Sequence, residues 1–206
     1  MTPLGSLIFG AIGLLFVALV GAAIWWALRG ANVMTDALAR DGWMVEKPGG
    51  LVRWSARRVK NGVAANIEVK ATGGTQSGRS VSTHVTVATD TGADDVLVER
   101  KAPGFLAADG MLAAAMGFTP PPRWEGGSPA FNADYNAYAS SAEAAARRLP
   151  PANQIAIIDY NSKAPQRVNV RFYNGTIEAR WAAEPQNAKQ LEGVVAMIGQ
   201  LRRAGK

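Results

Sequence analysis

Residues 51–72 read LVRWSARRVKNGVAANIEVKAT, and this stretch decides the fold class. Two runs that contain β-branched residues, the first of them also Trp54, flank the pair Asn61-Gly62. An Asn-Gly pair favours the two-residue turn whose positive φ angles match the twist of two paired strands. The stretch therefore predicts an antiparallel hairpin with strands over residues 51–59 and 63–72.

Strand patterns continue on the C-terminal side of this hairpin. RSVSTHVTVAT (79–89) alternates between two faces, one carrying valines and the other carrying polar side chains. VLVERK (96–101) fits a fourth strand. A second Asn-Gly pair, Asn174-Gly175, joins RVNVRFY (167–173) to TIEARWA (176–182) and predicts a second hairpin.

Helices are also predicted around these strands. Residues 31–43 (ANVMTDALARDGW) have apolar side chains at helical spacing, and Gly42 is a good C-terminal stop. Residues 104–118, which are rich in Ala, Leu and Met, predict a packed helix. NAKQLEGVVAMIGQLRRA (187–204) carries one apolar stripe and predicts a terminal amphipathic helix.

The region before the second hairpin combines several patterns. FNADYNAYA (131–139) alternates large and small side chains and predicts a strand. Ser140 and Glu143 fit a capping box that opens a short helix over AEAAARRL (142–149). ANQIAIIDY (152–160) is compatible with either a short helix or a strand.

Strands and helices come in blocks rather than in strict alternation, which favours an α+β fold with antiparallel hairpins, flanking helices and a C-terminal amphipathic helix. Four regions are predicted. They are a transmembrane anchor over 1–29, a strand-rich region with a juxtamembrane helix over 30–118, a proline- and glycine-rich connection over 119–130, and a β-α-β-hairpin-α region over 131–206 that packs with the strand-rich region.

The anchor is predicted from the run Leu4–Leu28, whose 25 residues include no charged side chain. As a helix this run is about 38 Å long, which exceeds the ~30 Å hydrocarbon core of a bilayer. A cleaved signal peptide has a basic flank and a shorter apolar run, and this segment has neither. Leu4, Leu15 and Leu28 are assigned to the span, and Trp25, Trp26 and Arg29 to the membrane interface.

The charges that flank the anchor predict its orientation. No Lys or Arg precedes it, whereas Arg29, Arg40 and Lys47 follow it. Positive residues stay on the cytoplasmic side, so the N-terminus is expected to face outward and the main domain to be cytoplasmic. The predicted location is therefore the inner membrane, with a single span and membrane lipid as one partner.

Composition excludes several chemistries. The 206 residues include no cysteine, so disulfides, thiolate catalysis and cysteine-ligated metals are ruled out. The net charge is +6, but the basic residues do not gather in a block, which is the pattern that a nucleic-acid interface requires. No nucleic-acid partner is expected.

GGTQSGRS (73–80) has the outline of a phosphate-binding P-loop. A P-loop leads from a strand into a helix, whose N-terminus and loop amides face the phosphates. Here a strand pattern follows the loop, and Arg79 stands where a P-loop has lysine. A glycine-rich connection between antiparallel strands explains the segment better.

No catalytic, cofactor-binding or metal-binding residue is assigned. His84 is the only histidine and lies on the polar face of a predicted strand, where a surface role explains it. DTGADD (90–95) lacks the ligand spacing and distal Glu of a calcium-binding loop. The sequence therefore predicts no enzyme activity.

Four basic residues lie close together on the first hairpin, beside a tryptophan. They are Arg53, Arg57, Arg58 and Lys60. This cluster could contact anionic lipid headgroups or an acidic partner. The alternative is that the charges protect an edge strand from aggregation.

The chain resembles bacterial single-pass membrane-anchored α+β proteins that are themselves uncharacterised. The resemblance rests on the N-terminal anchor, on LARDGW (38–43) and on SPAFNADYNAYASSAEAAARRLP (128–150). It implies a strand, a short helix ending in Leu-x-Pro, a hairpin and a terminal helix, and it supplies no catalytic residue.

The expected function is that of a non-enzymatic membrane-anchored protein. Its cytoplasmic domain would bind another membrane or membrane-associated protein, as an accessory or assembly subunit of a membrane complex. Two alternatives stay open: a domain that senses lipid headgroups or a small ligand, and a membrane-tethered enzyme without a recognisable motif.

Overall fold

The computed structural model describes residues 13–22, 33–60, 62–72, 80–89, 92, 94–101 and 122–204, and these divide into two compact units, Met1–Trp43 and Met44–Lys206. In the first unit, residues 13–22 and 33–40 are helical. The second helix ends as predicted: Gly42 has a φ of +80°, and the Trp43 N–H donates to the Leu38 carbonyl at 3.0 Å.

Within the described ranges, no helix is both long enough and apolar enough to cross a membrane. Of the residues predicted for the anchor, Leu15 lies on the helix 13–22, where every side chain is exposed. The other five, Leu4, Trp25, Trp26, Leu28 and Arg29, lie outside the described residues. The anchor therefore stays a prediction from the sequence.

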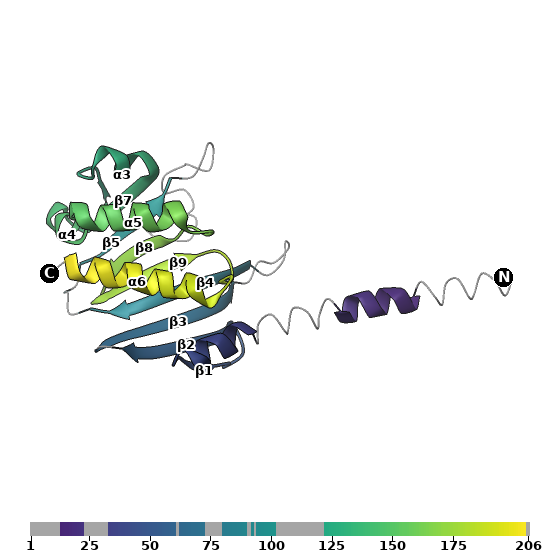
Figure 1. Ribbon diagram of the computed structural model, residues 1–206. Coiled ribbons are helices and arrows are strands. Elements are labelled where there is room, and N and C mark those ends of the chain that lie inside the picture. Colours follow the sequence, from purple (N-terminus) through teal and green to yellow (C-terminus); the bar gives the residue numbers. More distant parts are fainter. Residues whose placement is uncertain are drawn as a thin grey trace, which may run out of the picture. The chain divides into compact units, whose positions relative to one another are not determined.

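The second unit is built on one sheet of nine strands, in the order β1-β2-β3-β4-β9-β8-β5-β7-β6, with every neighbouring pair antiparallel (Figure 1). The strands are β1 (Met44–Glu46), β2 (Val52–Lys60), β3 (Val63–Thr72), β4 (Ser80–Ala88), β5 (Val96–Arg100), β6 (Arg123–Trp124), β7 (Tyr135–Ala139), β8 (Asn169–Tyr173) and β9 (Thr176–Trp181). The α+β class with antiparallel hairpins is confirmed.

Both predicted hairpins form. Lys60 and Val63 are the last paired residues of β2 and β3, and Gly62 has a φ of +70°. In the second hairpin, Asn174 and Gly175 both have positive φ angles, 45° and 69°. This is the conformation that a two-residue turn between right-twisted strands requires, and glycine and asparagine reach it at low cost.

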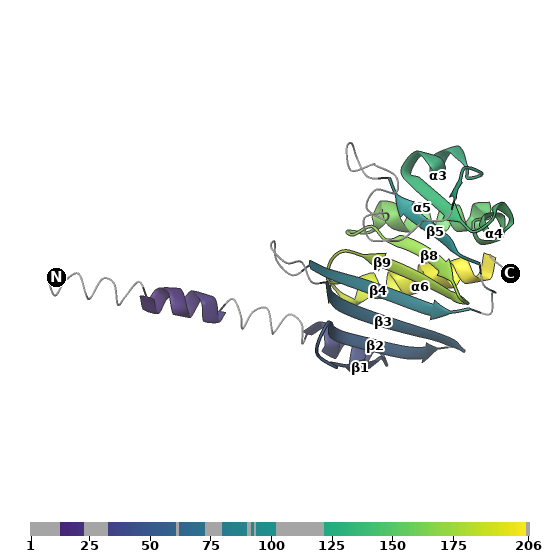
Figure 2. The ribbon, with the colours of Figure 1, turned by 180° about the vertical axis from the view of Figure 1, so that it is seen from behind.

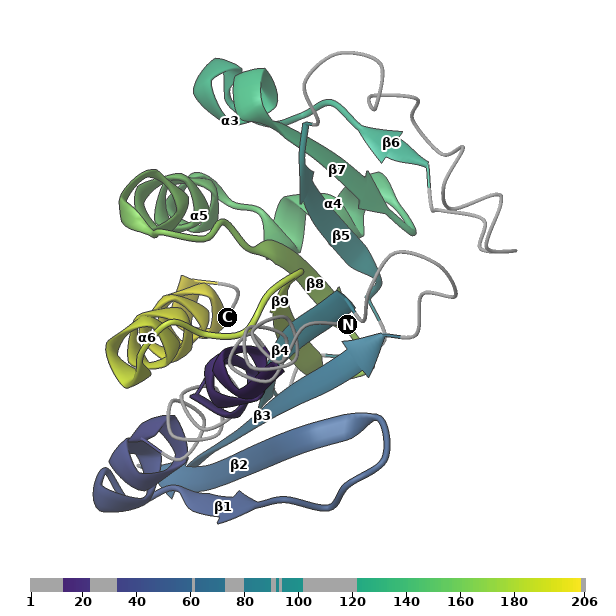
Figure 3. The same ribbon diagram turned by 90° about the vertical axis from the view of Figure 1, so that its right-hand side faces the viewer.

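The described residues of this unit also form four helices: α3 (Pro129–Asp134), α4 (Ala142–Arg148), α5 (Pro151–Lys163) and α6 (Ala188–Ala204). The predicted C-terminal helix is confirmed, and the segment 152–160 is helical within α5. Figure 3 shows α5 and α6 on the same side of the sheet.

The predicted strand over 131–139 is only partly right, because the chain is helical as far as Asp134 and extended only from Tyr135. Ser128 accepts a hydrogen bond from the Phe131 N–H, and Pro129 occupies the first helical turn. A serine cap followed by proline is a helix start, and this signal outweighs the alternation of the following side chains.

The predicted cap of α4 is also displaced by one residue. Ser141, rather than Ser140, accepts from the Ala144 N–H at 3.1 Å. The predicted helix 104–118 and the glycine-rich segment 73–79 lie outside the described residues. The connection 119–130 contributes Arg123 and Trp124 to the sheet as edge strand β6.

The core lies between the sheet and the helices. Ala56, Ile67, Val85, Ala179 and Val170 occupy one row across five adjacent strands, and each is at most 1 % exposed. Helix α6 faces this side of the sheet with its predicted apolar stripe. The predicted stripe consists of Leu191, Val194, Val195, Ile198 and Leu201; Val195 is only partly buried, and the other four are buried.

Candidate functional site

The opposite side of the sheet is polar. Arg57, Asn66, Thr86, Glu178 and Arg171 form one row across β2, β3, β4, β9 and β8. A second row contains Ser55, Glu68, His84 and Arg180. We call these two rows, together with Lys70 and Ser82, the polar face. Figure 2 shows the strands from this side, with α5 and α6 behind them.

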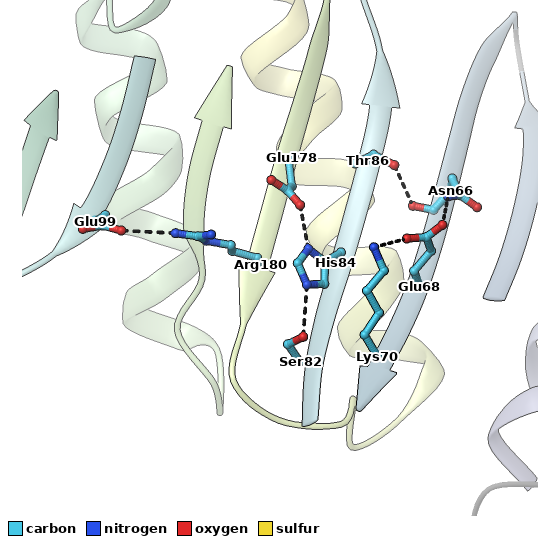
Figure 4. Close-up of polar contacts among 9 residues, drawn as sticks. All are labelled: Asn66, Glu68, Lys70, Ser82, His84, Thr86, Glu99, Glu178 and Arg180. Atoms are coloured by element: carbon cyan, nitrogen blue, oxygen red, sulfur yellow. Dashed lines mark hydrogen bonds and ion pairs between the residues drawn. The ribbon is translucent and has the colours of Figure 1, made fainter. Parts of the chain in front are cut away.

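A chain of hydrogen bonds runs through the middle of the polar face (Figure 4). The Ser82 hydroxyl lies 3.0 Å from Nε2 of His84, and Nδ1 of His84 lies 2.6 Å from Oε1 of Glu178. Ser82 and His84 are two residues apart on β4, so their side chains share a face, whereas Glu178 comes from the neighbouring strand β9.

Glu178 is the most buried acid of the polar face. Burial by itself raises the pKa of Glu178. The hydrogen bond and the charge of His84, together with the charges of Arg180 and Arg171, lower the pKa by more than burial raises it, so the pKa lies below its usual value. Glu68 behaves in the same way, because the hydrogen bond from Lys70, 2.6 Å away, lowers its pKa more than burial raises it.

The Ser82–His84–Glu178 chain reproduces the two hydrogen bonds of a serine-hydrolase triad. Such a triad also needs donors that hold the oxyanion formed during attack. Next to Ser82, Thr83 is paired on both sides, with Val69 and Trp181. The backbone N–H groups of this region therefore belong to the hydrogen-bond ladders of the sheet and do not form an oxyanion site. Lys70, opposite Ser82, is bonded to Glu68. This arrangement favours a structural role for the chain of bonds.

The four basic residues of the first hairpin are not presented as one surface. Arg57 lies on the polar face and Arg58 on the helix-covered face. Three of the four have carboxylate partners: Arg53 pairs with Glu184, Arg57 with Glu46 at 3.5 Å, and Arg58 with Glu192 of α6 at 2.9 Å. Three of the four residues of the predicted basic contact surface are therefore already paired with carboxylates of the same chain.

A groove of about 370 Å³ lies between α5 and α6, on the helix layer. The two helices are antiparallel there. Nδ2 of Asn153, near the start of α5, donates to the carbonyl of Leu201 near the end of α6 at 3.2 Å. Beyond the opposite end of α5, Gln166 accepts from Nε2 of Gln190 in the first turn of α6 at 3.2 Å. These bonds hold the two walls of the groove together.

Small side chains keep the groove open. Its lining includes Ala156, Gly193 and Ala196, together with the flexible Met197. At Gly193 a side chain would begin 3.4 Å from the Tyr160 ring, so larger residues there would fill the space between the helices. A volume of this size is in the range of ordinary binding sites.

Tyr160 forms part of the groove wall, and its hydroxyl is buried. No hydrogen-bond partner for this hydroxyl is found in the described part of the chain. Burial raises the pKa of Tyr160 to about 12, so the hydroxyl stays protonated at neutral pH.

One end of the groove is basic. Lys163, in the last turn of α5, pairs with Asp159 at 2.5 Å. Lys189 lies in the first turn of α6, which contains no acidic residue. No ion pair of Lys189 is present among the residues that the structure describes. A positive charge at a helix N-terminus is unfavourable and is relieved by a nearby anion.

Sequence reasoning missed both the groove and the partner of His84. The spacing of Gly193, Ala196 and Met197 was a usable signal, but its meaning depends on which helix lies opposite. Because residues 152–160 fitted either a helix or a strand, no opposing helix could be placed. Glu178 is 94 residues from His84, and no local pattern connects them.

Across the described ranges, no group of three or more His, Cys, Asp or Glu side chains could hold a metal ion. Compared with protein-family models, curated proteins and solved structures, the chain matches none. The function is therefore inferred from the sequence and geometry of this chain alone.

Proposed function

We propose that the protein is a non-enzymatic, membrane-anchored protein whose cytoplasmic α+β unit binds a protein partner, as an accessory or assembly subunit of a membrane complex. The α5–α6 groove carries this proposal. Its lining combines small apolar residues with polar and charged side chains. A concave, partly apolar surface with a few polar groups is typical of binding sites.

Membrane anchoring is supported by the first unit. The uncharged run Leu4–Leu28 is long enough to span a bilayer as a helix. Its described part, residues 13–22, exposes Leu14, Leu15 and Phe16. Contiguous exposed apolar side chains are costly in water, and lipid removes that cost. The excess of basic residues after the run supports a cytoplasmic domain.

A protein partner is favoured over a lipid headgroup because of where the positive charges lie. A headgroup site on the first hairpin needs available arginines, but Arg53, Arg57 and Arg58 each pair with a carboxylate of the same chain. The groove instead runs along two helices and presents a long, shaped surface, which suits a polypeptide segment.

The test is purification of the full-length protein from its native membranes in mild detergent, followed by measurement of the mass of the complex. A partner in fixed stoichiometry is expected. Ala196→Glu, on an exposed position of the groove, should release this partner while leaving the fold intact. A solitary monomer under gentle extraction would contradict the proposed function.

A second candidate, a membrane-tethered serine hydrolase, rests on the Ser82–His84–Glu178 chain. A fluorophosphonate probe decides between the two, because it reacts with activated serines. We expect no labelling of Ser82. Labelling that disappears in both Ser82→Ala and His84→Ala would favour the hydrolase instead.

A further inference from the structure

The residues that line the α5–α6 groove recur at helical spacing on both walls. Gly193, Ala196 and Met197 follow one another on α6, and Ala156 and Tyr160 on α5. Residues three and four apart share one helix face, so the lining forms a continuous furrow. The α6 wall runs from Lys189 to Gln200, about 16 Å at 1.5 Å per residue.

A furrow of this shape suits a third helix. Helices pack by inserting the side-chain ridge of one into the groove of another, and small residues on the floor permit close approach. Amphipathic helices bind grooves in this way, through apolar anchors at positions i, i+3, i+4 and i+7. The α6 wall is about three helical turns long, which is enough to contact anchors at positions i to i+7 of a bound helix.

The charges at one end of the groove indicate which charge the occupant carries there. Lys163 and Lys189 flank that end, and Asp159 is the single acidic residue of the lining. Asp159 pairs with Lys163, so within the described part of the chain the charge of Lys189 is left for the occupant to balance. Acidic side chains at this end of the bound helix would neutralise Lys189 and complement the N-terminus of α6.

We propose, building on the partner-binding function above, that an amphipathic helical segment of the partner protein occupies the groove. Its apolar stripe contacts the small residues of the lining, Ala156, Gly193 and Ala196. Its acidic side chains lie at the end that Lys163 and Lys189 flank.

The experiment uses the full-length protein in lipid nanodiscs and two displayed libraries of amphipathic helical peptides. The libraries share one apolar stripe and differ only in flanking residues, Glu in one and Lys in the other. Enrichment of Glu-flanked peptides is expected. The affinity of an enriched peptide should fall about tenfold, ~1.4 kcal/mol, in Lys189→Glu.

Arg57→Glu is the matched control, because it makes the same charge change at an exposed position of the polar face. It should leave the peptide affinity unchanged. Ala196→Gln should weaken binding by bulk alone, and Ala196→Glu should weaken it further by repulsion. Both residues are good helix formers at this exposed position, so the fold is kept.

Several outcomes would overturn the inference. These are no enrichment from either library, equal enrichment of Lys-flanked peptides, or loss of affinity in Arg57→Glu rather than in Lys189→Glu. A dimer of the purified protein that Ala196→Glu dissociates would identify a second copy as the occupant. If a stoichiometric partner is purified but survives Ala196→Glu, the proposed function stands and this site is wrong.

Discussion

The two faces of the sheet are built from the same strands, residue by residue, and differ in almost every physical respect. On β3, Ile67 is fully buried, whereas the next residue, Glu68, is half-buried and pairs with Lys70. On β4, Val85 is buried beside His84. The helix-covered face stabilises the fold by burial, and the polar face satisfies its charges internally. Exposed polar side chains in this sheet are therefore not by themselves a sign of a binding site.

The largest expected difference between the faces is at neighbouring positions of β3. Ile67→Ala should lower the free energy of unfolding by about 2–5 kcal/mol, because it removes buried methyl groups and leaves a cavity. Glu68→Ala, one residue later, should cost about 1 kcal/mol or less. Chemical denaturation of both variants measures the contrast, and equal losses would contradict the assignment of faces.

Glu178 sharpens the comparison, since it is the acid of the polar face that is most nearly buried. Its folded-state pKa lies below the ordinary 4.5, so its contribution to stability is complete above about pH 4.5 and is lost as pH falls through the folded-state pKa. Glu178→Gln should cost about 1–2 kcal/mol at pH 7. It should also flatten the acid side of the stability curve, as measured by denaturation between pH 2 and 7. An unchanged acid side would show that the His84 contact does not form.

Two neighbouring arginines of β2 give a smaller contrast. Arg58 reaches Glu192 at 2.9 Å with 12 % of its side chain exposed, whereas Arg57 reaches Glu46 at 3.5 Å with 63 % exposed. Arg58→Ala should cost about 1–2 kcal/mol, and Arg57→Ala at most about 0.5 kcal/mol. Raising the salt concentration should weaken only the Arg57 pair appreciably. A larger loss of stability in Arg57→Ala than in Arg58→Ala would contradict the assignment of the two arginines to opposite faces of the sheet.

The smallest effect at neutral pH is expected for Tyr160→Phe in the groove. The variant removes a buried hydroxyl that has no partner within the described residues, so stability at pH 8 should be unchanged or slightly higher. The pKa of Tyr160 is raised to about 12, so its ionisation in the unfolded chain near pH 10 favours unfolding. Wild type should therefore lose more stability than the variant between pH 10 and 12. A clear loss of stability at pH 8 would show that the hydroxyl is bonded.

Local signals predicted the local structure. The two Asn-Gly pairs fixed both hairpins, since few residues other than Gly and Asn accept positive φ, and the apolar stripe of 187–204 identified α6. Ser128 and Pro129 carried an equally local helix signal, which the alternation of residues 131–139 obscured. The helix cap was visible in the sequence, and the prediction was wrong because it gave the alternation more weight than the cap.

Long-range structure could not be predicted in this way. The pairing of β5 with β8 joins residues more than 70 positions apart in the sequence, and the contact between His84 and Glu178 joins residues 94 positions apart. The groove depends on the antiparallel packing of α5 against α6. No periodic pattern encodes these choices, because they follow from how whole elements share one core.

The most direct test of the account compares the groove with the polar face in the native membrane. A photo-crosslinking amino acid is placed at Ala196 in one variant and at Thr86 in another, both in the full-length protein. The account predicts one crosslinked partner in high yield from position 196, competed by a Glu-flanked amphipathic peptide, and none from position 86. A partner captured from position 86 alone, or from neither position, would contradict it.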